Sequence, residues 1–321
     1  MNRVTNGEVM PDQGAILVFH VRRSRQKAMQ AAMAEAVSLL ADFEPAVLAG
    51  GPLGDHPGLF WVKLPASVLP AALERIPLLG YTSAVDAVRF SESGGKRRAR
   101  RRAIQPTWRG RPFDLHPLYH EDSDRFRDQA PDRRSFVLRT KEGSLVRTRG
   151  YRGDGGELGR RGLPVTDARL LANLAFTRIG GRMLDPFADA GGVVLAGLQL
   201  QQEVFSLDID PALQWGLHDL GARHFVGDAR HLPFEDATFD SVASEAPFQA
   251  TGELLGEVMM EIARVLRPCG RVAAMLAEHQ AAPAREGARE GGLLLNLDTS
   301  IDRKGLPVVV LAWKRAPRTV A

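Results

Sequence analysis

Residues 182–196 read Arg-Met-Leu-Asp-Pro-Phe-Ala-Asp-Ala-Gly-Gly-Val-Val-Leu-Ala. This stretch predicts a short apolar strand ending at Asp185, a turn through Gly191 and Gly192, and the start of a helix. In an open parallel sheet, ligands bind outside the carboxyl ends of the strands, where a turn of small residues lets them approach the backbone and the next helix. A glycine turn is common on its own, but this one has the position of a nucleoside-cofactor site.

Acidic residues stand at the ends of successive predicted strands. Residues 203–208 predict a second strand ending at Asp208, and Asp210-Pro211 then has the N-cap residue and first-position proline typical of a helix start. Asp228 follows a third predicted strand that begins at His224. An acid at the second strand end suits a ribose diol, and we expect Asp228 to accept from an adenine amine. Each acid alone is typical of a helix cap, but the ordered set favours a cofactor site.

A fourth predicted strand begins at Phe239 and carries Glu-Ala-Pro-Phe at 245–248. Together with Asp-Pro-Phe-Ala at 185–188, Leu-Asp-Ile-Asp at 207–210, Gly-Asp-Ala-Arg-His-Leu-Pro-Phe at 227–234 and Arg-Val-Leu-Arg-Pro-Cys-Gly-Arg-Val at 264–272, this order resembles the class I S-adenosylmethionine-dependent methyltransferases. More narrowly, it resembles the THUMP-associated tRNA guanine-N2-methyltransferases. The resemblance covers about half of the chain, from residue 164 to residue 315.

The resemblance implies an α/β class I methyltransferase fold, which is Rossmann-like and has a seven-stranded sheet with an antiparallel final hairpin. Residues 293–302 and 307–314 predict that hairpin. The chain has neither a Gly-x-Gly-x-x-Gly motif nor a Gly-Lys-Ser/Thr phosphate loop, which argues against a nicotinamide-dependent dehydrogenase and a nucleotide triphosphatase. The implied cofactor is S-adenosylmethionine, and the implied cofactor-binding residues are Asp185, Phe187, Ala188, Asp189, Ala190, Gly191, Asp208, Ile209, Asp228 and Ala229.

Two positions depart from the family pattern. Asp189 stands where the first motif has glycine, and Glu245-Ala246-Pro247-Phe248 replaces Asp-Pro-Pro-Tyr. Aspartate tolerates left-handed backbone, so we expect the first turn to survive. The exocyclic amine of guanine is a poor nucleophile, and acceptors must hold its protons and aim its lone pair. We therefore assign catalysis to the altered fourth motif: Glu245 and the Ala246 carbonyl accept the amine hydrogens, Pro247 stiffens the loop, and Phe248 stacks on a base drawn from its helix. Core packing is the alternative for Phe248 alone.

Composition is that of a globular protein, with 44% hydrophobic and 25% charged residues in 321. The one cysteine, Cys269, excludes an internal disulfide and suits a reducing cytoplasm, and the first residues contain no apolar signal segment. We expect a cytoplasmic protein with no membrane partner. Residues 1–90 predict an α+β ferredoxin-like domain in β-α-β-β-α-β order, from segments 15–20, 24–40, 46–49, 59–64, 67–76 and 84–90.

Residues 91–160 predict a basic linker with a small β region, and residues 161–321 the methyltransferase domain. Between Lys96 and Arg161 there are 19 Lys and Arg and nine Asp and Glu, a net charge of +10 against +4 for the whole chain. Alternating apolar residues at 135–151 predict a hairpin around Glu142-Gly143. A localised basic excess is typical of a phosphate-backbone partner, and a solvated charge run is the alternative. The candidate RNA-binding residues are Arg97, Arg98, Arg100, Arg101, Arg102, Arg109 and Arg111.

These observations predict a methyltransferase that modifies an exocyclic amine, guanine N2, in RNA, with tRNA as the expected substrate. Two alternatives stay open: a degenerate methyltransferase domain that serves as an RNA-binding module, and a methyltransferase of small molecules or proteins. His116 and His120 have a spacing that suits a metal on a helix, but Pro117 lies between them and no cysteine cluster accompanies them. We expect no metal.

Overall fold

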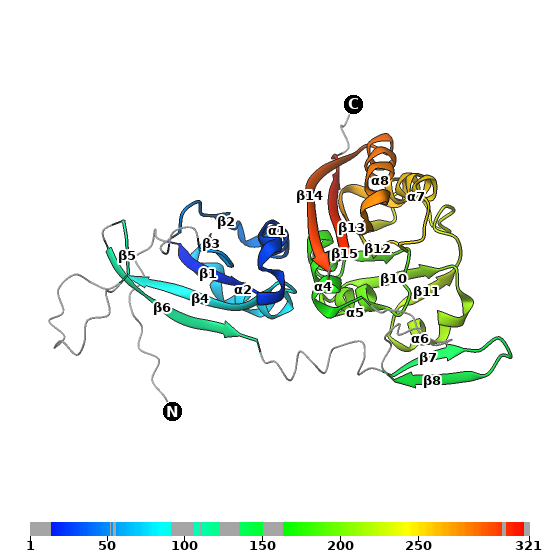
Figure 1. Cartoon of the computed structure of the whole chain (residues 1–321), viewed down its shortest axis with the longest axis horizontal. Coiled ribbons are helices and arrows are strands. Elements are labelled where there is room, and N and C mark those ends of the chain that lie inside the picture. Colours follow the sequence, from blue (N-terminus) through cyan, green and yellow to red (C-terminus); the bar gives the residue numbers. More distant parts are fainter. Residues whose placement is uncertain are drawn as a thin grey trace.

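The computed structural model describes residues 14–51, 53, 56–90, 106–109, 111–121, 135–149, 163–303 and 306–317. These residues form a six-stranded N-terminal sheet, a seven-stranded C-terminal sheet and a two-stranded hairpin, and Figure 1 shows helices packed on both large sheets and α6 beside the hairpin. Within these ranges no helix has both the length and the apolar character needed to span a bilayer.

The N-terminal half follows the predicted order of elements. It consists of β1 (Ala15–Val21), α1 (Met29–Leu39), β2 (Ala46–Val47), β3 (Leu59–Leu64), α2 (Leu69–Arg75) and β4 (Thr82–Phe90). The strands lie in the order β2-β3-β1-β4, and each pairs with its neighbours in antiparallel register. The helix predicted to begin at Ser24 starts as a short 3-10 segment, η1 (Arg23–Ala28), before α1 continues it.

Two further strands join this sheet beyond β4. They are β5 (Thr107–Trp108) and β6 (Arg111–His120), and β6 pairs along the length of β4. The sequence predicts an end to the domain at residue 90, so part of the predicted linker belongs to the sheet. Pro112 and Pro117 argue against a strand, yet Pro112 faces the two-residue β5 and Pro117 lies where the β4–β6 register shifts, the positions at which a sheet tolerates proline.

The C-terminal half has the strand order β11-β10-β9-β12-β13-β15-β14. Neighbours are parallel from β11 to β13, and β15 is antiparallel to both β13 and β14. The predicted Rossmann-like sheet with an antiparallel final hairpin is therefore confirmed. Its elements are α4 (Val165–Ala175), β9 (Arg182–Asp185), α5 (Gly192–Gln199), β10 (Glu203–Asp208), α6 (Gln214–Asp219), β11 (Arg223–Val226), β12 (Phe239–Glu245), α7 (Gly252–Val265), β13 (Leu266–Ala277), α8 (Glu278–Glu290), β14 (Leu293–Arg303) and β15 (Leu306–Arg315).

Helices cover both faces of this sheet, which explains the continuous apolar runs of its strands. Along β9, Met183 packs into the layer that contains α4 and α5, whereas the next residue, Leu184, packs into the layer that contains α7 and α8. The first of these layers is continuous with the core of the N-terminal half, because α1 packs against α4. Figure 1 shows α4 and β14 on the side of the C-terminal half that faces α1.

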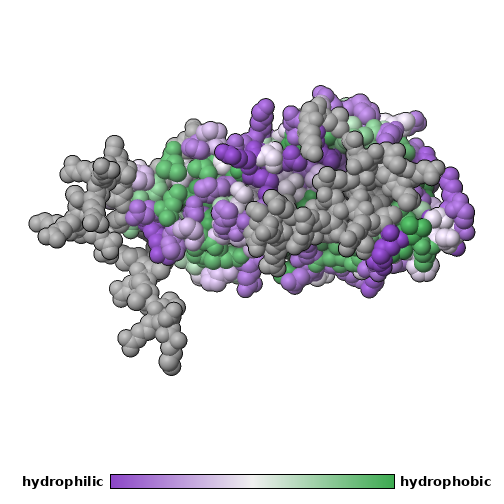
Figure 2. Space-filling model, turned by 60° about the horizontal axis from the view of Figure 1, so that its bottom comes forward, coloured by the Kyte–Doolittle hydropathy of each residue, from purple (hydrophilic) through white to green (hydrophobic). Residues whose placement is uncertain are grey.

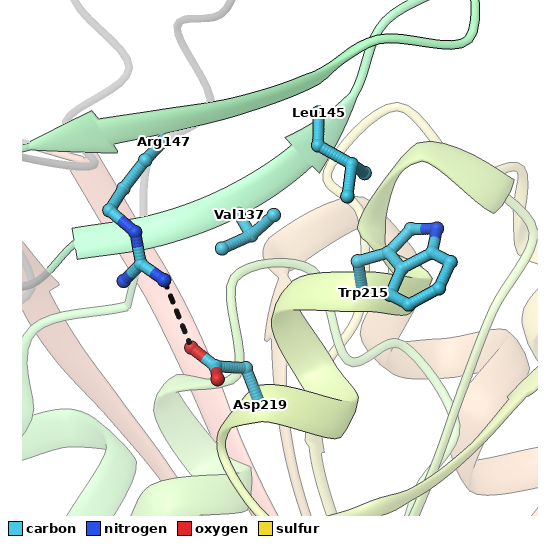
Figure 3. Close-up of a pocket in the computed structure, with 5 residues that line it drawn as sticks. All are labelled: Val137, Leu145, Arg147, Trp215 and Asp219. Carbon is cyan, nitrogen blue, oxygen red and sulfur yellow. Dashed lines mark ion pairs between the residues drawn. The ribbon is translucent and has the colours of Figure 1, made fainter.

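The predicted hairpin consists of β7 (Ser135–Arg139) and β8 (Leu145–Arg149), with Gly143 in left-handed backbone at its turn. It docks on α6, where the ring of Phe136 is buried so closely over Gly216 that a Cβ there would overlap it. A hollow of about 340 Å³ lies between the hairpin and α6 (Figure 3), lined by Val137, Leu145, Arg147, Trp215 and Asp219. None of the predicted site residues lines it.

The molecular surface mixes polar and apolar residues. Figure 2 shows hydrophobic and hydrophilic side chains interspersed over the visible face, with hydrophobic surface on both sheet-containing halves. The exposed large apolar side chains include Leu145 and Trp215 beside the hairpin and Ile209 after β10.

Candidate functional site

The turn after β9 begins at a buried carboxylate. Asp185 ends the strand, is 1% exposed, and accepts hydrogen bonds from the Ser244 hydroxyl at 2.6 Å and the Phe187 amide at 3.3 Å. Burial raises the pKa of Asp185 to about 7, although both hydrogen bonds oppose this shift. The turn then passes through buried Ala188 and half-buried Ala190 to Gly191, the residue before α5.

Backbone geometry at this turn fits the sequence. Asp189 has a φ of 39° and Gly191 a φ of 75°, both left-handed, so the expectation that aspartate supports this turn is confirmed. Gly191 suits this left-handed position, and a Cβ there would lie 2.5 Å from Leu220 Cδ1, so that side chain would have to shift.

Asp208 fixes this turn to the next strand end. Its carboxylate accepts from the Asp189 amide at 2.9 Å and from the Asp210 amide at 3.0 Å, and the Ala188 amide donates to the Leu207 carbonyl at 3.0 Å. Asp210 caps the following helical turn, as predicted, by accepting from the Ala212 amide at 2.8 Å. Two amides leave an aspartate with further acceptor positions, which suits a ribose diol.

The third acid is engaged by an arginine. Asp228 accepts three hydrogen bonds from the Arg230 side chain and one from its amide, at 2.6 to 3.1 Å, and these lower the pKa of Asp228. Ala229 beside it is buried, whereas Ile209 is 72% exposed at the end of β10. An adenine amine would therefore share Asp228 with the Arg230 guanidinium.

These residues fit an S-adenosylmethionine site. The ends of β9, β10 and β11 meet at one edge of the sheet, because Asp185 pairs with Ser206 and Asp208 with Val226 in parallel register. Asp208 is oriented by backbone amides, and Gly191 leaves room beside the first helix turn. Asp208 would hold the ribose, Ile209 would cover the adenine, and the Asp189 turn would receive the methionine end.

The fourth strand end presents Glu245 beside a cation. Glu245 forms an ion pair with Arg303, the last residue of β14, and burial raises the pKa of the carboxyl despite this pair. The Arg303 guanidinium also lies 5.9 Å from the centre of the half-buried Phe248 ring. The Glu245 carboxylate and the Phe248 ring therefore lie close together, and the Arg303 guanidinium contacts both of them.

A buried amide holds the loop after Glu245. The Gln280 side chain, from α8, donates to the Pro247 carbonyl at 2.7 Å and the Ala250 carbonyl at 3.0 Å, and accepts from the Ala277 amide at 2.9 Å. The Ala246 amide donates to the Met275 carbonyl at 3.0 Å. Gln280 and these backbone bonds fix the loop, so Pro247 is not its only support.

Arg303 connects this loop to the domain interface. Its Nε lies 3.4 Å from Asp167 Oδ2, on α4, and Asp167 is fully buried. Asp167 also accepts from Arg25 Nη2 at 2.7 and 2.9 Å and from the Tyr81 hydroxyl at 2.9 Å. Pro164 is the N-cap of α4, and Asp167, in the first turn of this helix, is buried against the two arginines.

The described RNA-binding candidates lie on an aromatic cluster at the far end of the N-terminal sheet. Arg109 lies 4.7 Å from the Trp108 ring centre and Arg111 lies 4.6 Å from that of Phe90, while the two rings stack at 6.0 Å. Both arginines are exposed and both rings are half-buried. The other candidates, Arg97, Arg98, Arg100, Arg101 and Arg102, lie outside the described residues.

Sequence reasoning missed three residues around Glu245. Asp167, Gln280 and Arg303 lie 78, 35 and 58 positions from Glu245 in the chain, and none belongs to a strand-end motif. Arg303 directly follows the strand predicted over residues 293–302, and no feature of the sequence points it toward Glu245. Within the described ranges, no group of three or more His, Cys, Asp and Glu side chains has the arrangement of a metal site.

Comparison with known proteins agrees with the fold. The family model of the methyltransferase domain matches residues 187–274, and no curated protein sequence matches the chain. Among solved structures, the chain is similar to TrmN from Thermus thermophilus, at 15% identity and a TM-score of 0.49, over 94% of this chain and 99% of that one. It is also similar to a TehB-like S-adenosylmethionine-dependent methyltransferase from Corynebacterium glutamicum, at 22% identity and a TM-score of 0.40, over 46% and 86%.

A third similar structure is a geranyl diphosphate methyltransferase in complex with GPP and sinefungin. The identity is 15% and the TM-score 0.41, over 48% of this chain and 78% of that one. At these values the structural likenesses leave the substrate open. Residues 187–274 match the methyltransferase domain family, and the strand order of the C-terminal sheet is that of the class I methyltransferase fold. The cofactor of such a domain is S-adenosylmethionine.

Proposed function

We propose that the protein methylates an exocyclic amine in RNA, the N2 of a guanine in tRNA. The observation that carries this proposal is that Arg303 contacts both Glu245, the last residue of β12, and the Phe248 ring. The carboxylate and the aromatic face therefore lie together at the end of a strand that neighbours β9. A carboxylate suits the N–H edge of a base, and an aromatic ring suits its π-face.

Glu245 would accept an amine hydrogen, which draws the nitrogen lone pair out of the ring and aims it at the methyl group. S-adenosylmethionine, when bound, supplies that methyl group as a sulfonium. The sulfonium sulfur of the bound cofactor would keep the electron pair of its bond to the methyl carbon. The amine then loses a proton, and a carboxylate whose pKa burial raises is a suitable acceptor for it.

The RNA part of the proposal is supported by the aromatic cluster and the charge. Trp108 and Phe90, with Arg109 and Arg111 on their faces, combine stacking surface and cations, as single-stranded nucleic acid requires. The surrounding segment carries the net charge of +10. The β2-β3-β1-β4 order is that of a ferredoxin-like fold, so we propose this half as a ferredoxin-like RNA-binding module that presents the substrate.

The test is incubation with S-adenosylmethionine labelled on its methyl group and total tRNA, followed by nucleoside analysis. We expect label in N2-methylguanosine. Glu245→Gln keeps the side-chain shape and should reduce turnover by about 10–1000-fold with unchanged cofactor affinity. Equal turnover of the two proteins would remove Glu245 from catalysis, and label in another nucleoside would change the target.

A second candidate is a binding module without turnover, and the ion pairs favour it. Glu245 is paired with Arg303 and Asp228 with Arg230, so two of the four strand-end acids are engaged. In that case the chain binds tRNA and S-adenosylhomocysteine in a calorimeter, yet no RNA acquires label.

A further inference from the structure

The side chain of Arg303 has the contacts that the proposed function gives to the target base. Its Nη1 donates to Glu245 Oε1, and its guanidinium carbon lies 5.9 Å from the Phe248 ring centre. A guanidinium is a planar group with N–H donors along one edge, as is the N1–N2 edge of guanine. Both groups therefore compete for one carboxylate and one aromatic face.

Arg303 also has a second anionic partner to which it could move. Asp167 Oδ2 lies 3.4 Å from Arg303 Nε, and Asp167 is held in place by Arg25 and the Tyr81 hydroxyl. If the guanidinium moves from Glu245 toward Asp167, the ion pair with Glu245 is lost and the existing ion pair with Asp167 becomes closer. The arginine stays paired during this exchange, so its charge is never left buried alone.

Arg303 lies where such a movement is feasible. It is the last residue of β14, and its side chain is 18% exposed, so it is partly open to solvent beside the buried Asp167. Its contact with the Met275 sulfur at 3.7 Å is weak. The backbone can stay in the β14–β15 ladder while the long side chain changes rotamer.

We propose that Arg303 is a positioning residue that occupies the base subsite: it holds Glu245 in the empty enzyme and is displaced onto Asp167 when an amine-bearing base enters. This inference rests on the proposed function, because it takes Glu245 as the amine acceptor. It predicts that the wild-type protein binds an amine-bearing base more weakly than the site itself would, since the amine can reach Glu245 only after the arginine has left it.

The test measures binding of guanosine monophosphate by equilibrium dialysis at pH 8, on the alkaline side because burial raises the pKa of Glu245. Inosine monophosphate serves as the second probe, because it has the same ring system without the exocyclic amine. In Arg303→Ala we expect the Kd for guanosine monophosphate to fall by about tenfold or more, and the Kd for inosine monophosphate to change by less than about threefold. Thermal melting checks that the variant is folded.

Arg285→Ala is the matched control. Arg285 lies on α8 and pairs with Asp298 on β14 at 2.8 and 2.9 Å, so this variant removes an arginine–carboxylate pair from the same strand without touching Glu245. It should leave both dissociation constants unchanged. If Arg303→Ala fails to fold, Arg303→Lys keeps a charge near Asp167 but loses the planar edge, and we expect a gain of about threefold.

Equal affinity of wild type and a folded Arg303 variant for guanosine monophosphate would overturn the proposal, as would an equal gain for both probes, which would mean only a larger hollow. Failure of the proposed function gives a different result. If Arg303→Ala gains affinity for guanosine monophosphate while neither protein labels tRNA, the subsite stands and the transfer reaction does not. If wild type labels tRNA and no variant gains affinity, the reaction stands and the displacement does not.

Discussion

At the scale of single residues, Asp185 is the clearest case in which position decides chemistry. It is the first acid of the cofactor motif, yet it is buried and its neighbours donate only two hydrogen bonds. A folded pKa of about 7 against an ordinary value of 3.8 means that the folded state binds the proton more tightly. Its contribution to stability is therefore complete below about pH 4 and is lost as the pH rises through about 7.

Asp185→Asn keeps the acceptor oxygen and removes this titration. We expect the free energy of unfolding of the variant, relative to wild type, to increase between pH 4 and pH 8 by up to about 4 kcal/mol, the equivalent of the full shift. Urea titrations at several pH values measure this difference. A flat difference for Asp185→Asn would show that burial does not hold the proton.

At the scale of elements, the cofactor edge is a set of strand ends joined by carboxylate-to-amide bonds. Asp208 binds the amides of Asp189 and Asp210, so it fixes the turn after β9 as well as the end of β10. Asp208→Ala loses both bonds and the ribose acceptor, and we expect cofactor affinity to fall by about 10–150-fold, from about 1.5–3 kcal/mol for a charged hydrogen-bond partner. Calorimetry with S-adenosylhomocysteine measures it.

Asp208→Asn tests a partial loss, because the amides of Asp189 and Asp210 bind different carboxylate oxygens and asparagine keeps only one of these oxygens. An intermediate loss of affinity is expected. If Asp208→Ala binds the cofactor with the affinity of wild type, Asp208 does not contact the ribose and the proposed cofactor site is wrong.

The β5–β6 strands carry the second prediction at this scale. Trp108 stacks on Phe90 under Arg109, so Trp108→Ala should weaken tRNA binding by about 1–3 kcal/mol, the value of one stacking face. Filter binding at several salt concentrations measures affinity. Trp215→Ala is the control: this indole is 49% exposed on α6, outside the cluster. Equal losses in the two variants would mean that any surface tryptophan matters, and the aromatic cluster would have no special role.

Element order was predictable from sequence because β9, β10 and β12 are mainly apolar runs that end in an acid, and these signals are local. The strand β6 was missed for an equally local reason: two prolines and a basic run hide its alternation. Around Glu245 the sequence predicted the acid and the ring but not Arg303 or Gln280. Both residues come from elements that follow the loop in the chain, α8 and β14, and contact it only in the folded structure. Contacts between residues so far apart in the chain produce no recognisable pattern in a single sequence.

At the scale of the whole molecule, the two halves share one core and a set of buried polar contacts. Glu35 on α1 is fully buried and accepts from Asn173 Nδ2 at 2.7 Å and from the amides of Gly80 and Tyr81. A Cβ at Gly80 would overlap the Thr166 carbonyl, so glycine allows this close approach. The Arg25–Asp167 pair lies beside them.

Arg25→Ala should therefore destabilise the whole chain. It leaves the buried Asp167 carboxylate with less compensation, which costs about 3–5 kcal/mol when a buried pair loses one partner. Urea unfolding should change from one transition to two as the halves separate. Arg289→Ala, which removes an exposed pair with Glu286 on α8, should leave the free energy of unfolding nearly unchanged. A similar small loss for Arg25→Ala would mean that the halves are held by their apolar contact alone.

The Arg25–Asp167 pair also bears on synthesis of the chain. Its two residues are 142 positions apart, so at about 5–20 residues per second the ribosome makes Asp167 on the order of ten seconds after Arg25. Arg303 follows later still. The N-terminal sheet can close by then, but Arg25 and Glu35 face water until α4 emerges. Until then, Arg25 and Glu35 lack their partners on α4. We therefore expect arrested chains that end before residue 165 to be more sensitive to protease at α1 than chains that include α4.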